Sequence, residues 1–96
     1  MTSDEMMEKR LHIVVSGRVQ GVWYRASTRS QAQSLGLVGK VWNRSDGRVE
    51  IVVEGVEGTL QQLLAWCADG PSGAQVDNLE NNWSPATGEF DEFKIT

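Results

Sequence analysis

Apolar and polar residues alternate along several short stretches of the chain, and this two-residue period is typical of half-buried β-strands. The most regular stretch covers residues 48–54, in which Val49, Ile51 and Val53 share one face, and residues 11–16 alternate in the same way. Further strands are predicted over residues 37–44 and 75–83 and in a short stretch that holds Phe93 and Ile95.

Three details of these strands follow from the same pattern. The charged residues of the stretch 48–54, Glu54 among them, should face away from the core, because they alternate with apolar residues. In the stretch 75–83 the alternation slips between Val76 and Leu79, which predicts a β-bulge. Ser45-Asp46-Gly47 predicts a hairpin turn, because Asp-Gly tolerates the positive φ that such turns need.

Two other stretches have the period of amphipathic helices. The helices are predicted over about residues 23–35 and 57–69, and Gly36 and Gly70-Pro71 are well placed to end them. The side chains expected to form their buried stripes are Tyr24, Thr28, Ala32 and Leu35 in the first helix and Leu60, Leu63, Leu64 and Cys67 in the second.

The order of elements is therefore strand, helix, strand, strand, helix, strand, with a short terminal strand. This is the ferredoxin-like split βαβ pattern of the α+β class, in which two helices cover one face of an antiparallel sheet. We expect one such domain over residues 10–96. Residues 1–9 are expected to form a flexible leader, because the chain begins with the polar sequence MTSDEMMEKR.

Composition narrows the possible functions. A net charge of −4 argues against general binding of nucleic acid, which depends on basic residues that face phosphates. No apolar run approaches the roughly 18 residues of a membrane span, and the first residues lack the apolar stretch of a signal peptide, so a cytoplasmic protein is expected. A single cysteine, Cys67, and a single histidine, His12, cannot assemble a zinc site, so no metal is expected.

The segment between the first strand and the first helix is a candidate anion site. Gly17-Arg18-Val19-Gln20-Gly21-Val22 holds two glycines four residues apart and opens a helix. The N–H groups at a helix start are unpaired and lie at the positive end of the helix dipole, and glycines let an anion approach closely. The segment is therefore a candidate phosphate or carboxylate cradle, although on spacing alone a plain strand-to-helix turn is the commoner explanation.

Arg25 strengthens the phosphate hypothesis. It lies in the first turn of the predicted helix, where a cation opposes the dipole and a stabilising sequence would place Asp or Glu. A bound anion between Arg25 and the loop accounts for this position, since a guanidinium can hold two oxygens of one phosphoryl group. A solvated surface arginine is the alternative. Arg18 could add positive potential, but exposure to solvent is the simpler expectation.

Asn43 is the third candidate. Alternation places it on the same face as Leu37 and Val41, which the helices should cover, and a polar amide there needs hydrogen-bond partners. It also ends its strand, where it can face the start of a helix. The alternative is that Asn43 only prepares the Asp46-Gly47 turn, since asparagine is common near turns.

The segments that hold these candidates resemble two linked motifs of the acylphosphatase family. The first is Ser16-Gly17-Arg18-Val19-Gln20-Gly21-Val22-Trp23-Tyr24-Arg25, and the second is Leu35-Gly36-Leu37-Val38-Gly39-Lys40-Val41-Trp42-Asn43, followed by Ser45-Asp46-Gly47-Arg48-Val49-Glu50. The resemblance covers about residues 9–96. Lys40 stands where the family often has an aromatic residue, and Arg44-Ser45 differs from the commonest turn sequences, but neither departure removes a catalytic group.

The resemblance implies an enzyme that hydrolyses acyl phosphates to a carboxylate and inorganic phosphate, without a metal, a cofactor or a phosphoenzyme. Arg25 matches the family's catalytic arginine, Asn43 its water-orienting asparagine, and the loop from Gly17 through Val22 its phosphate cradle. Because an asparagine is no conventional base, the substrate phosphate is hypothesised to accept the proton. The expected partners are a small-molecule acyl phosphate and its phosphate product, with no nucleic acid and no membrane, and the protein is expected to be a monomer.

Two other functions fit the same fold. One is a catalytically silent phosphate-binding module, because fold alone does not establish activity. The other is a regulatory or RNA-binding ferredoxin-like domain, but RNA binding would need aromatic residues on the strands at 11–16 and 48–54, and neither contains one. Turnover of a small acyl phosphate distinguishes the enzyme from the binding module.

Overall fold

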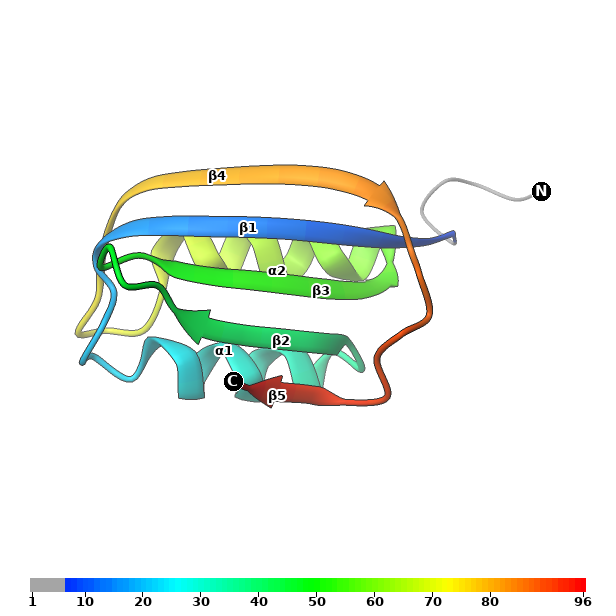
Figure 1. Ribbon diagram of the computed structural model, residues 1–96, viewed down its shortest axis with the longest axis horizontal. Helices are drawn as coiled ribbons and strands as arrows, with labels where there is room; N and C mark the ends of the chain where they lie inside the picture. The colour runs from blue at the N-terminus through cyan, green and yellow to red at the C-terminus, as the bar shows by residue number, and fades with distance from the viewer. Residues whose placement is uncertain (1–6) are drawn as a thin grey trace.

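The computed structural model describes residues 7–96. Its elements follow the order β1 (Glu8–Arg18), α1 (Tyr24–Ser34), β2 (Val38–Asn43), β3 (Val49–Val56), α2 (Glu57–Asp69), β4 (Gln75–Pro85) and β5 (Phe93–Ile95). This order confirms the predicted ferredoxin-like α+β fold, with both helices on one face of a five-stranded sheet (Figure 1).

The first strand is longer than its apolar alternation predicted. It begins at Glu8 and ends at Arg18, and Lys9 already pairs with Gly55 of β3 and Pro85 of β4. Glu8 and Lys9 therefore belong to the sheet, whereas residues 1–6 of the expected leader lie outside the described residues. Pairing on both sides extends β1 because backbone hydrogen bonds form regardless of side-chain polarity.

The sheet is mixed, not purely antiparallel as the sequence pattern suggested. Its strand order is β4-β1-β3-β2-β5, and only the pair β2–β5 is parallel. After β4 the chain crosses one end of the sheet to the opposite edge, where β2 also starts, so β5 runs in the direction of β2 (Figure 1). No helix between residues 7 and 96 is long and apolar enough to cross a bilayer.

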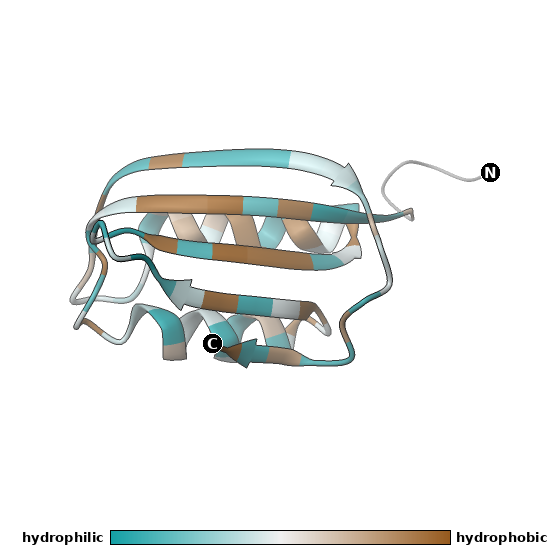
Figure 2. Cartoon of the chain, viewed as in Figure 1, coloured by the Kyte–Doolittle hydropathy of each residue, from teal (hydrophilic) through white to brown (hydrophobic). Residues whose placement is uncertain are grey.

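The core fills the space between the sheet and the helices. Helix α1 packs on β2 and β5, and α2 packs on β1, β3 and β4. Apolar residues concentrate along β1 and β3 in the middle of the sheet, whereas β4 at the edge is mostly hydrophilic (Figure 2). The largest fully buried side chains are Tyr24, Phe93, Leu11, Ile13, Ile51, Leu60, Leu63, Val15, Val19, Val41, Val49 and Val53.

The predicted bulge in the fourth strand is present. Ser16 pairs with Asn78, but the next residue, Gly17, pairs with Val76, so Asp77 is the extra residue of β4. The bulge lies where β1 gives way to the loop that precedes α1, at the end of the sheet that carries the candidate site.

Glu54 is not solvated, contrary to the expectation for the charged residues of β3. Its side chain lies on the sheet face away from the helices, yet Glu54 is only 3% exposed. Its carboxylate accepts hydrogen bonds from the N–H groups of Thr87 and Gly88 and pairs with Arg10 at 3.1 Å. Burial opposes ionisation of Glu54, but the hydrogen bonds from Thr87 and Gly88 outweigh it and lower the pKa of Glu54. Glu54 thus fastens the β4–β5 connection to the sheet.

Glu54→Gln should lower the free energy of unfolding by about 2 to 4 kcal/mol at neutral pH, because an amide cannot satisfy all these donors. The lowered pKa means that the stabilisation is complete above the unfolded-state pKa of about 4.3 and is lost as the pH falls through the lower folded-state pKa. Urea unfolding between pH 7 and 3 should therefore show the variant and the parent protein converging in acid.

The exposed Glu80 on β4 provides the control for Glu54. Glu80→Gln should change the stability by no more than about 0.5 kcal/mol. A difference between Glu54→Gln and the parent protein that stayed constant down to pH 3 would contradict the role given to the Glu54 carboxylate.

Candidate active site

The loop between β1 and α1 presents a series of unpaired backbone donors. Among residues 7–96, the N–H groups of residues 19–25 find no hydrogen-bond acceptor. The N-cap residue Trp23 has a left-handed backbone, with φ of 67°, and no side-chain cap, and the first turn of α1 contains no acidic residue. The positive end of the helix dipole is therefore uncompensated within the described structure, which suits an anion.

Gly17 and Arg18 were predicted to belong to the loop, but they are the last two residues of β1 and pair with β4, so the loop spans residues 19–23. Gly17 and the loop glycine, Gly21, have different structural roles. Gly17 has a φ of +125° and lies against the bulge of β4, where an added Cβ would lie 2.2 Å from the carbonyl oxygen of Gln75 and 2.8 Å from the nitrogen of Asp77. Gly21 has a φ of +75°, but an added Cβ there meets nothing within 4 Å. Gly17 is thus needed for close backbone packing and Gly21 for the turn of the loop alone.

Gly17→Ala should therefore destabilise the protein far more than Gly21→Ala. The left-handed backbone alone costs an alanine about 1–2 kcal/mol, which is the loss expected at Gly21. The added collision at Gly17 should raise the loss above about 3 kcal/mol or prevent folding. Thermal and urea unfolding of both variants check this, and equal losses would show that the bulge does not restrict the loop.

Tyr24 fixes the start of α1 and so positions the adjacent Arg25. Tyr24 is 1% exposed, its hydroxyl donates to the carbonyl oxygen of Cys67 in α2 at 2.7 Å, and its ring packs on Trp66. Burial raises the pKa of Tyr24, so the hydroxyl stays neutral. Arg25 is half-buried and forms no salt bridge with another residue between 7 and 96.

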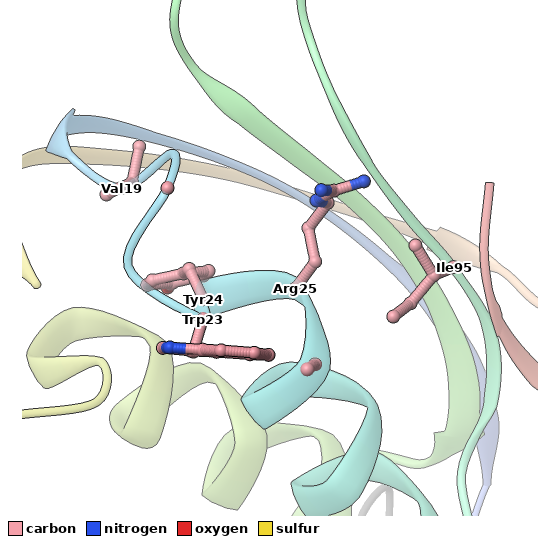
Figure 3. A pocket seen from close by; sticks show the side chains of 7 residues that line it. Val19, Trp23, Tyr24, Arg25 and Ile95 are labelled. Atoms are coloured by element: carbon pink, nitrogen blue, oxygen red, sulfur yellow. The ribbon is translucent and has the colours of Figure 1, made fainter.

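Arg25 and the loop line one pocket of about 430 Å³. Figure 3 shows Arg25 extending from the start of α1, with Val19 of the loop on one side and Ile95 of β5 on the other. The lining residues are Val19, Gly21, Trp23, Tyr24, Arg25, Ala26 and Ile95. Arg25 and the loop therefore lie beside the same cavity. Ile95 has no feature in the sequence that indicates a site role, because its place at the pocket depends on the parallel pairing of β5 with β2, which leaves no local signal.

Asn43 ends β2 at the end of the molecule where α1 begins (Figure 1). It lies two residues beyond Val41, on the same face, and Val41 is the strand partner of the pocket residue Ile95. The Oδ1 atom of Asn43 is buried and has no hydrogen-bond partner among the described residues. An unpaired buried acceptor is uncommon and calls for a functional explanation.

The hairpin turn after Asn43 closes without the Asn43 side chain. Arg44 N–H donates to the Arg48 carbonyl at 2.8 Å, and Gly47 N–H donates to the Arg44 carbonyl at 3.2 Å. Asp46 accepts from the backbone N–H of Arg48 at 3.1 Å. Hydrogen bonds from the side chain and backbone of Arg48 lower the pKa of Asp46 to about 2, and Arg44 and Arg48 both pair with this carboxylate. The turn therefore adds no unpaired negative charge near Asn43.

Gln20 joins the loop to this turn. Its side-chain Nε2 donates to the carbonyl oxygens of Arg44 at 2.8 Å and Arg48 at 3.0 Å. The neighbouring residues differ in exposure: Val19 is buried in the core, Val22 packs against the core, and Arg18, the last residue of β1, is exposed. The side chains of Val19 and Val22 thus anchor the loop, whereas the side chain of Trp23 is exposed.

The other candidate reactive groups lie elsewhere or are inert. Cys67 is buried in α2, and burial raises the pKa of its thiol to about 12, so it is no nucleophile at neutral pH. His12 hydrogen-bonds to Glu50 on the sheet face away from the helices. Between residues 7 and 96, no cluster of three or more His, Cys, Asp or Glu side chains is arranged to hold a metal ion.

Comparison with known proteins identifies the family. The acylphosphatase family model matches residues 11–95. An acylphosphatase of Methylococcus capsulatus is 53% identical over 91% of this chain and 95% of the relative, and one of Pelotomaculum thermopropionicum is 49% identical over 94% of this chain and 98% of the relative. The crystal structure of acylphosphatase from Bacillus subtilis, 35% identical, covers 92% of this chain and 98% of that chain with a TM-score of 0.88. The chain therefore belongs to the acylphosphatase family.

Proposed function

We propose that the chain hydrolyses acyl phosphates with the phosphoryl group held by the loop and Arg25 and the attacking water held by Asn43. The observation that carries this proposal is the unpaired, buried Oδ1 of Asn43, at the same end of the fold as the unpaired Arg25 and the unpaired N–H groups of residues 19–25. These groups are complementary to a phosphoryl group and a water, which are the two reactants of the hydrolysis.

The binding step follows from charge. The N–H groups of the loop and the start of α1 donate to the phosphoryl oxygens, and the Arg25 guanidinium contacts two of them. Charge on these oxygens persists through phosphoryl transfer, so the same donors stabilise the substrate and the transition state. Because a carboxylate is a good leaving group, positioning and electrostatic stabilisation are the main tasks of the protein.

The hydrolytic step requires a water in line with the bond that breaks. Asn43 Oδ1 accepts a hydrogen bond from this water and thereby fixes its oxygen opposite the leaving group. The water oxygen forms a bond to phosphorus while the bond from phosphorus to the acyl oxygen breaks, and the carboxylate leaves with the electron pair. An amide oxygen is a weak base, so the water proton passes to an oxygen of the phosphate itself.

Turnover of acetyl phosphate tests this proposal. We expect release of acetate and phosphate in the presence of a metal chelator, with inorganic phosphate as a competitive inhibitor. Activity lost in chelator and restored by a divalent ion would contradict the metal-free reaction. Binding of phosphate without turnover would instead favour a catalytically silent module, and non-competitive inhibition would place the anion site outside the pocket.

We further propose that the protein acts as a monomer in the cytoplasm. Within residues 7–96 the large hydrophobic side chains that are exposed are Met7 and Trp23, which are too few for an extended apolar interface. The single cysteine is buried as a thiol, which suits a reducing compartment. Size-exclusion chromatography with light scattering should give a mass near 10.6 kDa.

A further inference from the structure

We infer that Gln20 is a positioning residue of this site: its side-chain amide sets the distance between the phosphate cradle and Asn43. The inference rests on the proposed function, because this distance matters only if the cradle and Asn43 act on one substrate. The residue pattern placed Gln20 in the cradle itself, but the contacts of its side chain point to another role.

Both hydrogens of the Gln20 side-chain amide are donated to the hairpin turn. An amide Nε2 carries two donors, and here they are directed to the carbonyl oxygens of Arg44 and Arg48 at 2.8 and 3.0 Å. These residues begin and end the turn, where Arg44 N–H also donates to the Arg48 carbonyl. With both donors used, Nε2 has none left for a phosphoryl oxygen, whereas the backbone N–H of Gln20 stays unpaired among the described residues.

This contact joins the two halves of the proposed site directly. Arg44 follows Asn43 in the chain, so its carbonyl moves with the residue that would hold the water. Gln20 lies two residues beyond the end of β1 and directly before Gly21, whose positive φ is a backbone conformation that glycine adopts easily. Within residues 17–23, Gln20 is the one residue whose side chain hydrogen-bonds to the rest of the described chain, and it makes two such bonds.

The loop is also attached to the fold through Val19, and comparing the two attachments shows what the Gln20 amide contributes. Val19 is 1% exposed and anchors the loop to the core. That apolar contact holds the cradle in the fold, but it is non-directional and does not set the alignment of the cradle with the end of β2. The two hydrogen bonds from Gln20 are directional, so they fix where a bound phosphorus lies relative to a water on Asn43.

Removing the amide should therefore reduce catalysis more than phosphate binding. Gln20→Met keeps the length and most of the volume of the side chain but has no donor. We expect kcat for acetyl phosphate to fall by about 10- to 100-fold, the effect of a misplacement of about 1 Å between reacting groups. The inhibition constant of inorganic phosphate should change by less than about threefold, because the N–H groups and Arg25 remain.

A second variant and a matched control complete the experiment. Gln20→Asn retains the amide on a side chain one carbon shorter, which cannot reach both carbonyls, and kcat should fall here too. Gln61→Met is the control, since Gln61 is exposed on α2 and its Nε2 bonds only Glu57, at 3.4 Å. Its kcat should be unchanged. Thermal melts of all the variants separate loss of catalysis from loss of folding.

The outcomes distinguish this inference from the proposed function. A parent protein that turns over acetyl phosphate and a folded Gln20→Met variant with the same kcat would overturn the positioning role alone. A loss in kcat matched by an equal loss in phosphate affinity would also overturn it and place Gln20 among the phosphate-binding groups. A parent protein with no turnover would overturn the proposed function and, with it, the inference.

Discussion

Replacing Arg25 with alanine should lower kcat/KM for a small acyl phosphate by about 10³-fold or more, with kcat falling and the inhibition constant of phosphate rising together. Arg25 lines the pocket and forms no ion pair with another described residue, so its charge is available to a phosphoryl group before and during the reaction. The fold should survive the change, because a cation in the first turn opposes the dipole of α1. Steady-state kinetics, phosphate inhibition and a thermal melt measure the three effects.

Arg25→Lys separates charge from geometry. A lysine keeps the positive charge but cannot make the two-pronged contact of a guanidinium, so it should recover little of the lost activity. Arg29→Ala removes an equal charge from the exposed face of α1, one turn further on, and should leave the kinetics nearly unchanged. Near-normal activity of Arg25→Lys would show that the fork geometry of the guanidinium is unimportant. A similar loss of activity in Arg29→Ala would show that the loss in Arg25→Ala comes from the lower positive charge of α1 and not from a lost contact with the phosphoryl group.

Asn43→Ala should lower kcat by about 10²-fold or more while the protein stays folded and still binds phosphate. The Oδ1 atom has no partner among the described residues, and the hairpin turn closes without this side chain, so little stability depends on it. Loss of the group that holds the water would leave the phosphoryl group bound but the attacking water unplaced. Turnover and phosphate affinity, measured beside a thermal melt, test this.

Asn43→Asp tests the electrostatics at the same position. The carboxylate keeps the shape and an acceptor oxygen but brings a negative charge towards the bound phosphate, so both phosphate affinity and kcat should fall. A folded Asn43→Ala variant with unchanged turnover would remove Asn43 from the mechanism. The loop and Arg25 would then form a phosphate-binding site without a group that positions water.

Most residues of the candidate site could be predicted from the sequence, because each of them carries a local signal. Glycines in a strand-to-helix loop, a cation in the first turn of α1 and a polar residue on the core face of β2 are each visible within a few residues. In the structure, Arg25 and Gly21 line one pocket. Asn43 ends β2, the strand that pairs with β5 beside this pocket. The catalytic roles of these residues stay predictions until the variants above are measured.

The sequence by itself determined the elements, their order and the buried faces, because periodicity and turn residues act over short distances along the chain. It also contained the bulge at Asp77, as a slip in alternation. Only the tertiary structure decided which distant groups meet. The Gln20 amide reaches a carbonyl 24 residues away, and Glu54 binds Thr87, 33 residues away. Polar contacts of this kind leave no period in the sequence, because they depend on where the folded backbone brings single donors and acceptors together.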